Sequence, residues 1–235
     1  MVPAKKDVPS NPSTEDESKK ETKKPSQKII SASDFETSMT KLAKSAVSPD
    51  ASLRESARKT LGLLVEYILI RLCERINQLL SRTNKKTLTS REVLDASHLI
   101  FHEDLSEHIK KQMFQHIGNF FQSINSGEKS SKPIPYNVRA GLTVSTSRIG
   151  AYVMKNCIVS RRSERAVIAA ASVVETVMHE VIEYSYHQVK DARKVKMTPK
   201  NINDAINGIS ELNLFFKDCF ILGCKELYHP PLKEE

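Results

Sequence analysis

Apolar residues recur at helical spacing along two stretches of this chain that are much longer than the rest. Steps of three and four over about eight turns make up the first stripe, which contains Leu61, Leu64, Val65, Ile68, Leu72, Ile76 and Leu79. The second stripe contains Ile168, Ala171, Val174, Met178, Val181 and Ser185. Shorter helical patterns flank each stripe, so the chain repeats one short–long–short arrangement twice. A unit that cannot bury its long helix alone favours pairing of the two units within one polypeptide.

Capping residues predict where these helices begin. Ser33 is a plausible cap for the first short helix, and Ser52 with Glu55 reads as a capping box before the first long helix. In the next short helix, Thr89 and Glu92 form a second box. Ser163 caps the second long helix, and Thr198 with Pro199 begins the last one. The pattern predicts helices over 35–47, 53–83, 90–99, 104–124, 148–155, 164–190 and 199–208. No convincing strand is present, so the predicted fold class is all-α.

Composition divides the chain into segments. The first stretch is rich in Pro, Ser, Lys and Glu and contains almost nothing apolar, which is typical of disorder. Asn125–Pro133 has the composition of a linker. The predicted divisions are a disordered tail (1–31), a first helical domain (32–124), a linker (125–138), a second helical domain (139–217) and a short C-terminal segment (218–235).

Charge and cysteine usage restrict the partners. Lys and Arg number 36 and Asp and Glu 28, and the resulting net charge of +8 suits an anionic partner such as nucleic acid or a membrane surface. No apolar run reaches the roughly 18–20 residues that span a bilayer, so we expect no membrane partner. Cys73, Cys157, Cys219 and Cys224 lack C-x-x-C spacing, which indicates reduced thiols in an intracellular compartment.

Short motifs in the two halves resemble two different core histones. The stretch from Pro49-Asp50 to Thr87-Leu88-Thr89-Ser90-Arg91-Glu92 resembles histone 2B, and 104–124 matches the additional C-terminal helix of that histone. Resemblance to histone 2A is carried by Arg139-Ala140-Gly141-Leu142, Arg148, Arg161, Glu175, Glu180, Glu183, Thr198-Pro199 and Glu211-Leu212-Asn213. Two partner histones in this order are similar to the fused histone doublets of giant DNA viruses (Marseillevirus family).

The resemblance implies two tandem histone folds that form an intramolecular handshake heterodimer. In such a pair the long helices cross antiparallel, so the first loop of each half lies beside the second loop of the other. Basic loop residues would then meet successive phosphates and minor grooves of DNA. The implied DNA-binding residues are Arg54, Lys85, Lys86, Thr87, Arg139, Arg148, Arg161, Arg162, Arg193, Lys194 and Lys196. Arg161 matches a position whose arginine enters the minor groove, and it is the strongest candidate.

Acidic residues match the surface through which chromatin proteins dock onto nucleosomes. The implied partner-binding set is Asp104, Glu175, Glu180, Glu183 and Glu211. Ile209, Ser210 and Gln112 replace acidic residues of the family, so the patch is diluted. A solvated helix face is the alternative interpretation of these glutamates.

Catalytic and metal sites find little support. His179-Glu180-Val181-Ile182-Glu183 begins like the zinc-protease motif, but Glu183 replaces its second histidine. His98 and His102 have the spacing of two metal ligands without a third. We therefore predict no enzyme activity, no metal and no cofactor.

The resemblance implies a viral core histone doublet that wraps double-stranded DNA largely without sequence specificity. Its expected partners are a doublet with histone 4 and histone 3 folds and a second copy of itself in an octamer-like particle. The expected location is intracellular, in the virion and in the viral factory or host nucleus. Two alternatives stay open: a histone-fold transcription-factor subunit, and a histone-fold scaffold module that binds protein or lipid.

Overall fold

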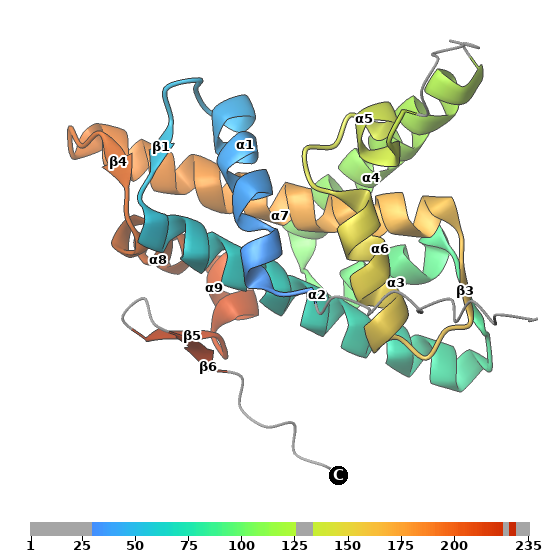
Figure 1. Cartoon of the computed structure of the whole chain (residues 1–235). Helices are drawn as coiled ribbons and strands as arrows, with labels where there is room; N and C mark the ends of the chain where they lie inside the picture. Colours follow the sequence, from blue (N-terminus) through green and yellow to red (C-terminus); the bar gives the residue numbers. More distant parts are fainter. Residues whose placement is uncertain (1–29, 126–133, 223–225, 229–235) are drawn as a thin grey trace, which may run out of the picture.

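The computed structural model describes residues 30–125, 134–222 and 226–228 of the chain. Over these residues it is almost entirely helical (Figure 1), which confirms the predicted fold class. The predicted tail lies outside the described residues, except for its last two positions, and so do most of the predicted linker and the end of the C-terminal segment. Within the described residues, no helix is both long and apolar enough to cross a membrane.

The first half consists of one 3-10 turn, four helices and two short strands. In chain order they are η1 (Ala32–Asp34), α1 (Glu36–Ala46), β1 (Ser52–Leu53), α2 (Glu55–Thr83), β2 (Thr87–Leu88), α3 (Ser90–Ile100) and α4 (Glu103–Asn125). The second half contains α5 (Tyr136–Ala140), α6 (Thr146–Asn156), β3 (Arg161–Arg162), α7 (Glu164–Asp191), β4 (Lys196–Met197), α8 (Pro199–Gly208), α9 (Ser210–Phe216), β5 (Phe220–Leu222) and β6 (Glu226–Tyr228).

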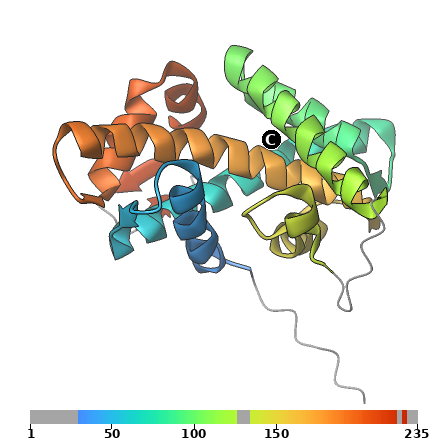
Figure 2. The same ribbon diagram turned by 90° about the horizontal axis from the view of Figure 1, so that it is seen from above.

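The long helices α2 and α7 run antiparallel and are joined at both ends by short parallel strand pairs. β1 pairs with β4, which brings the start of α2 to the end of α7. β2 pairs with β3, which brings the end of α2 to the start of α7. In Figure 2, α1 and α6 lie on one side of α7, whereas α4 lies on the other. The two halves therefore form the predicted intramolecular handshake.

One hydrophobic core contains residues of both halves. An aromatic group joins them most directly: the ring of Tyr67 in α2 lies 5.5 Å from that of Phe215 and 5.8 Å from that of Phe216, both in α9. Phe101, which follows α3, lies 4.6 Å from the ring of Phe215. Because each half covers apolar surface of the other, the heterodimer is a single packing unit.

Three of the predicted helix starts are confirmed. Thr89 and Glu92 form a reciprocal capping box, and the Ser163 hydroxyl accepts the amide of Ala166. Thr198 occupies the N-cap position of α8 with Pro199 in the first turn, and its amide and hydroxyl donate to Oδ1 of Asn201. Two predicted starts are wrong. Ser33 lies inside η1, and Ser52 lies in β1 where it pairs with β4, so α2 begins only at Glu55.

Two short helices, α5 and α9, lie outside the predicted helix ranges. α5 occupies the end of the predicted linker and closes on Gly141, whose φ of 74° is the left-handed conformation that glycine adopts readily. A second glycine, Gly62, allows a close approach of backbone: a Cβ there would lie 2.5 Å from the carbonyl oxygen of Ala32 in η1. The short turn η1 can therefore rest directly on α2.

Candidate nucleic-acid interface

The end of the molecule at β2 and β3 brings four of the predicted DNA-binding residues together. Thr87 pairs with Arg161 in the strand register, and Leu88 pairs with Arg162. The carbonyl of Lys86 accepts the amides of Ser160 at 2.9 Å and Arg161 at 3.2 Å. Lys86, Thr87, Arg161 and Arg162 are all exposed. Backbone pairing between the halves thus presents cations and a hydroxyl at one place, a combination suited to phosphates.

Lys85, at the same end, is engaged within the protein. Its Nζ lies 2.8 Å from Oε1 of Glu92, and the other Glu92 oxygen accepts the amide and hydroxyl of Thr89. Burial raises the pKa of Glu92, but the hydrogen bonds from Lys85 and Thr89 outweigh burial and lower it to about 2. Lys85 remains half-exposed. Its ion pair with Glu92 holds the loop between α2 and α3 against the start of α3.

Arg162 packs against α6 of its own half. Its guanidinium occupies the space beside Gly150, where a Cβ would lie only 1.5 Å from Nη1. Nearby, the hydroxyl of Tyr136 donates to the carboxylate of Glu164, and this bond raises the pKa of Tyr136 while Arg139 and Arg162 oppose the rise. Arg139, which is half-buried in α5, therefore lies at the same end of the molecule as the β2–β3 pair.

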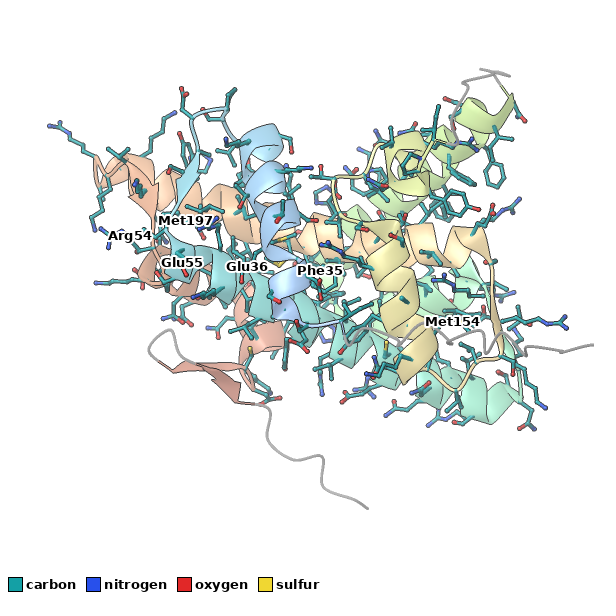
Figure 3. All side chains as sticks on the ribbon, in the orientation of Figure 1. Phe35, Glu36, Arg54, Glu55, Met154 and Met197 are labelled. Atoms are coloured by element: carbon teal, nitrogen blue, oxygen red, sulfur yellow. The ribbon has the colours of Figure 1, made fainter. Side chains whose placement is uncertain are left out.

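The opposite end carries the remaining loop cations. Ser52 pairs with Lys196, and the amide of Arg54 donates to the carbonyl of Met197 at 3.1 Å, so Arg54 and Met197 appear together in Figure 3. Arg193 takes a left-handed conformation in the turn that leads into β4. The side chains of Arg54, Arg193, Lys194 and Lys196 are exposed. The two basic ends are thus built alike, each from one strand of either half.

Arg148 lies between these ends, on α6. Its guanidinium donates to the backbone carbonyl of Asp34, and this bond ties α6 to η1. In Figures 1 and 2, α1 and α6 lie on the same side of α7. Arg148 is exposed, and two exposed lysines of α1, Lys41 and Lys44, add charge to these central helices.

Arg58 is a further candidate that the sequence reasoning missed. It lies one turn into α2 from Arg54, and its Nε is buried without a hydrogen-bond partner among the described residues. A buried donor without a partner requires an explanation, and an anion at this helix start would provide one. The sequence does contain a sign of this role, because Arg58 follows Arg54 by four residues and so lies on the same face of the helix.

The predicted acidic surface needs one correction. Glu175 is only 9% exposed, and its carboxylate accepts the amides of Thr143 at 2.8 Å and Val144 at 2.9 Å. Burial raises its pKa, and these amides oppose the rise. Glu175 thus anchors the turn before α6 and does not belong to a docking surface.

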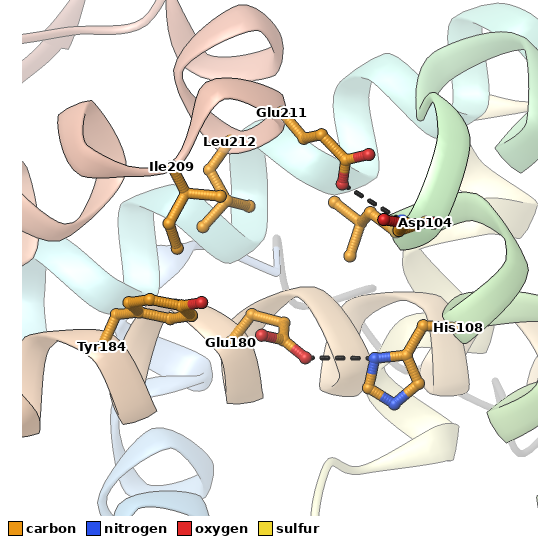
Figure 4. Close-up of a pocket in the computed structure, with 8 residues that line it drawn as sticks. Asp104, His108, Glu180, Tyr184, Ile209, Glu211 and Leu212 are labelled. Carbon is orange, nitrogen blue, oxygen red and sulfur yellow. Dashed lines mark hydrogen bonds and ion pairs between the residues drawn. The ribbon is translucent and has the colours of Figure 1, made fainter.

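Three of the other four acidic residues lie around a pocket of about 260 Å³ shown in Figure 4. Asp104, Glu180 and Glu211 line it together with Tyr184 and apolar side chains. Glu180 pairs with Nδ1 of His108 at 3.0 Å, and Glu211 accepts the amide of Leu105 at 3.1 Å. Glu183 lies outside this lining and pairs with His179 at 3.6 Å.

His98, one of the two candidate metal ligands, is engaged within the protein. Nδ1 of His98 is hydrogen-bonded to the hydroxyl of Ser106 at 2.6 Å, across the junction of α3 and α4. Within the described part of the chain, no cluster of three or more His, Cys, Asp or Glu side chains has the arrangement of a metal site.

Comparison with known proteins gives a consistent set of relatives, although no family model matches the chain. A histone doublet of types 2B and 2A from Melbournevirus is 26% identical over 166 residues, which is 71% of this chain and 60% of that protein. Histone 2A.Z of Eremothecium gossypii is 33% identical over 102 residues, 42% of this chain and 77% of the histone. Histone 2A variant X of Dictyostelium discoideum is 30% identical over 92 residues, 39% of this chain and 60% of the histone. The matched regions span about 60% of the Melbournevirus and Dictyostelium proteins. These relatives are histones and not enzymes.

Proposed function

Because this chain belongs to the histone family, as a fused doublet of a histone 2B-like and a histone 2A-like fold, we propose that it packages double-stranded DNA. The observation that carries the proposal is the pair of basic ends, each formed by one strand from either half. α2 has 29 residues and is about 43 Å long. The two ends are therefore farther apart than one turn of DNA, which is about 34–36 Å long. One molecule therefore reaches separate phosphate clusters along a duplex.

The chemistry of these ends favours binding with little sequence preference. Arg161, Arg162, Arg193 and Lys196 lie in or beside two-residue strands, whereas a sequence reader inserts a helix or longer ribbon into the major groove. Contacts to phosphates and to the inward-facing minor groove carry little base information. A site-specific transcription factor would instead retain its site against excess random DNA.

We extend the proposal to nucleosome-like particles with a partner that supplies the histone 3 and histone 4 folds, two doublets of each kind. An exposed apolar surface supports it: Leu99 and Leu214 are 55% and 50% exposed and line one pocket with Arg71, Arg75 and His102. Exposed apolar side chains bordered by polar and charged ones fit a protein partner. The acidic surface at Asp104, Glu180, Glu183 and Glu211 would stay free for a basic chromatin protein, with the particle in the virion, viral factory or host nucleus.

Nuclease digestion tests the particle. The doublet is assembled on DNA with the candidate partner, and the protected fragments are sized. A discrete protected length is expected, whereas a smear would contradict wrapping.

Substitution of Arg161 tests the DNA-facing surface. Arg161→Ala should weaken binding on all DNA sequences and reduce the slope of log affinity against log salt by about one, because one phosphate contact is lost. Lys110→Ala is the matched control, since Lys110 lies on α4 and pairs with Glu107. Equal affinity and slope for Arg161→Ala and the unmodified chain would overturn the assignment.

A further inference from the structure

Two cysteines meet where the halves contact each other. Cys73 lies in the middle of α2 and is 3% exposed, and Cys157 directly follows α6 and is 8% exposed. The neighbouring thiol of Cys157 and burial both raise the pKa of Cys73. One thiol comes from each histone fold, so a bond between them would cross the heterodimer.

Hydrogen bonds of the Asn77 side chain fix this meeting point. Asn77, one turn after Cys73 on α2, donates from Nδ2 to the carbonyl of Asn156 at 3.0 Å. Its Oδ1 accepts the amide of Ile158 at 2.9 Å. Asn156 and Ile158 flank Cys157, so the peptide on both sides of that cysteine is clamped to α2. The clamp holds the backbone around Cys157 against α2, one turn from Cys73.

We propose that Cys73 and Cys157 form a reversible disulfide that links the two histone folds covalently, with a small-molecule disulfide as the oxidant. Both thiols are buried, but Cys157 reacts first because it is 8% exposed and is flanked by the exposed Asn156 and Ile158, whereas Cys73 is 3% exposed in the middle of α2. The Cys157 thiolate attacks the oxidant, forms a mixed disulfide and releases one thiolate.

Cys73 then completes the exchange. Its thiol loses a proton, and its sulfur attacks Sγ of Cys157 and releases the second thiolate. Two protein thiols are oxidised and one small disulfide is reduced to two thiols, so atoms and electrons balance. This inference is independent of DNA binding. The cross-link closes the loop from residue 73 to residue 157 and restricts the unfolded chain, so the melting temperature should rise by roughly 5–15 °C.

The full chain treated with oxidised glutathione tests the proposal. The expected product has lost two hydrogens in intact mass, has two of its four cysteines blocked to alkylation, and yields a proteolytic fragment joining residues 73 and 157. Dithiothreitol should restore the original mass and melting temperature. Cys157→Ser should show no oxidant-dependent rise in melting temperature, whereas Cys219→Ala, at a buried cysteine elsewhere, should respond like the unmodified chain.

Three results would overturn the proposal. They are four alkylatable thiols after oxidation, stable glutathione adducts on Cys73 or Cys157 without a cross-link, and a cross-linked fragment containing Cys219 or Cys224. The mass measurement on the unmodified chain decides the outcome even if a variant fails to fold.

Discussion

Glu92 shows how one buried carboxylate can organise the loop between α2 and α3. It caps α3 through Thr89 and holds Lys85. Glu92→Gln should lower the free energy of unfolding at pH 7 by about 1–3 kcal/mol, a range that allows for solvent screening at the half-exposed Lys85. The measurement is denaturant unfolding of both proteins from pH 7 to pH 2.

The pH dependence has a defined direction. The pKa of Glu92 is lowered to about 2 in the folded protein, so its contribution is complete above the ordinary pKa near 4.5 and is lost as pH falls toward 2. The two stabilities should therefore converge in that window. Glu107→Gln, at an exposed pair on α4, is the control and should change stability by less than about 0.5 kcal/mol. A gap between Glu92→Gln and the unmodified chain that is constant with pH would contradict this account.

The sequence predicted which side chains are charged, but not whether each charged side chain is buried or exposed in the fold. Glu175 and Glu180 lie on one helix and look equivalent in the sequence, yet only Glu180 reaches the surface. Two backbone amides before α6 donate to the buried carboxylate of Glu175 and compensate for its burial, and nothing in the helical pattern of α7 indicates where those amides lie. For the same reason the ion pair of Lys85 was not foreseen, since it depends on how the loop turns back onto α3.

Among the elements, η1 depends on the absence of a side chain on α2. Gly62→Ala should push Ala32 off the helix, because the new Cβ would lie 2.5 Å from a backbone oxygen that cannot rotate away. We expect a loss of about 1–3 kcal/mol in the free energy of unfolding.

Gly118→Ala is the matched control for this change. It lies in α4 with no atom within 4 Å of the added carbon, so it should stabilise by about 0.5–1 kcal/mol through helix propensity. Equal effects of the two substitutions in thermal unfolding would show that η1 does not rest on α2.

The long helices were predictable because periodicity accumulates over many turns, as in α2 and α7. The short strands were not, because two residues carry no periodic signal. Their pairing is decided by the antiparallel crossing of the long helices, a tertiary event. Ser52 pairs with Lys196 in this way and therefore does not cap α2 as expected.

The whole molecule folds as one unit, and neither half should fold when it is expressed on its own. Expressed separately, 30–125 and 134–228 should each lack cooperative thermal unfolding, because aromatic and aliphatic core residues of one half pack on the other. Mixing them should restore the helicity and the cooperative transition seen by circular dichroism. A sigmoidal melt with full helicity from either half alone would contradict the shared core.

The strand pairs have a thermodynamic consequence. Each basic end exists only while β1 meets β4 or β2 meets β3, so a polyanion that prefers these ends binds the paired state and not its separated halves. Any such ligand raises the free energy of separation by RT ln(1 + [L]/Kd), about 2.7 kcal/mol at a hundredfold excess over Kd. DNA would in this sense select for correctly paired doublets, and a mispaired chain would be recognised by its weak retention on the duplex.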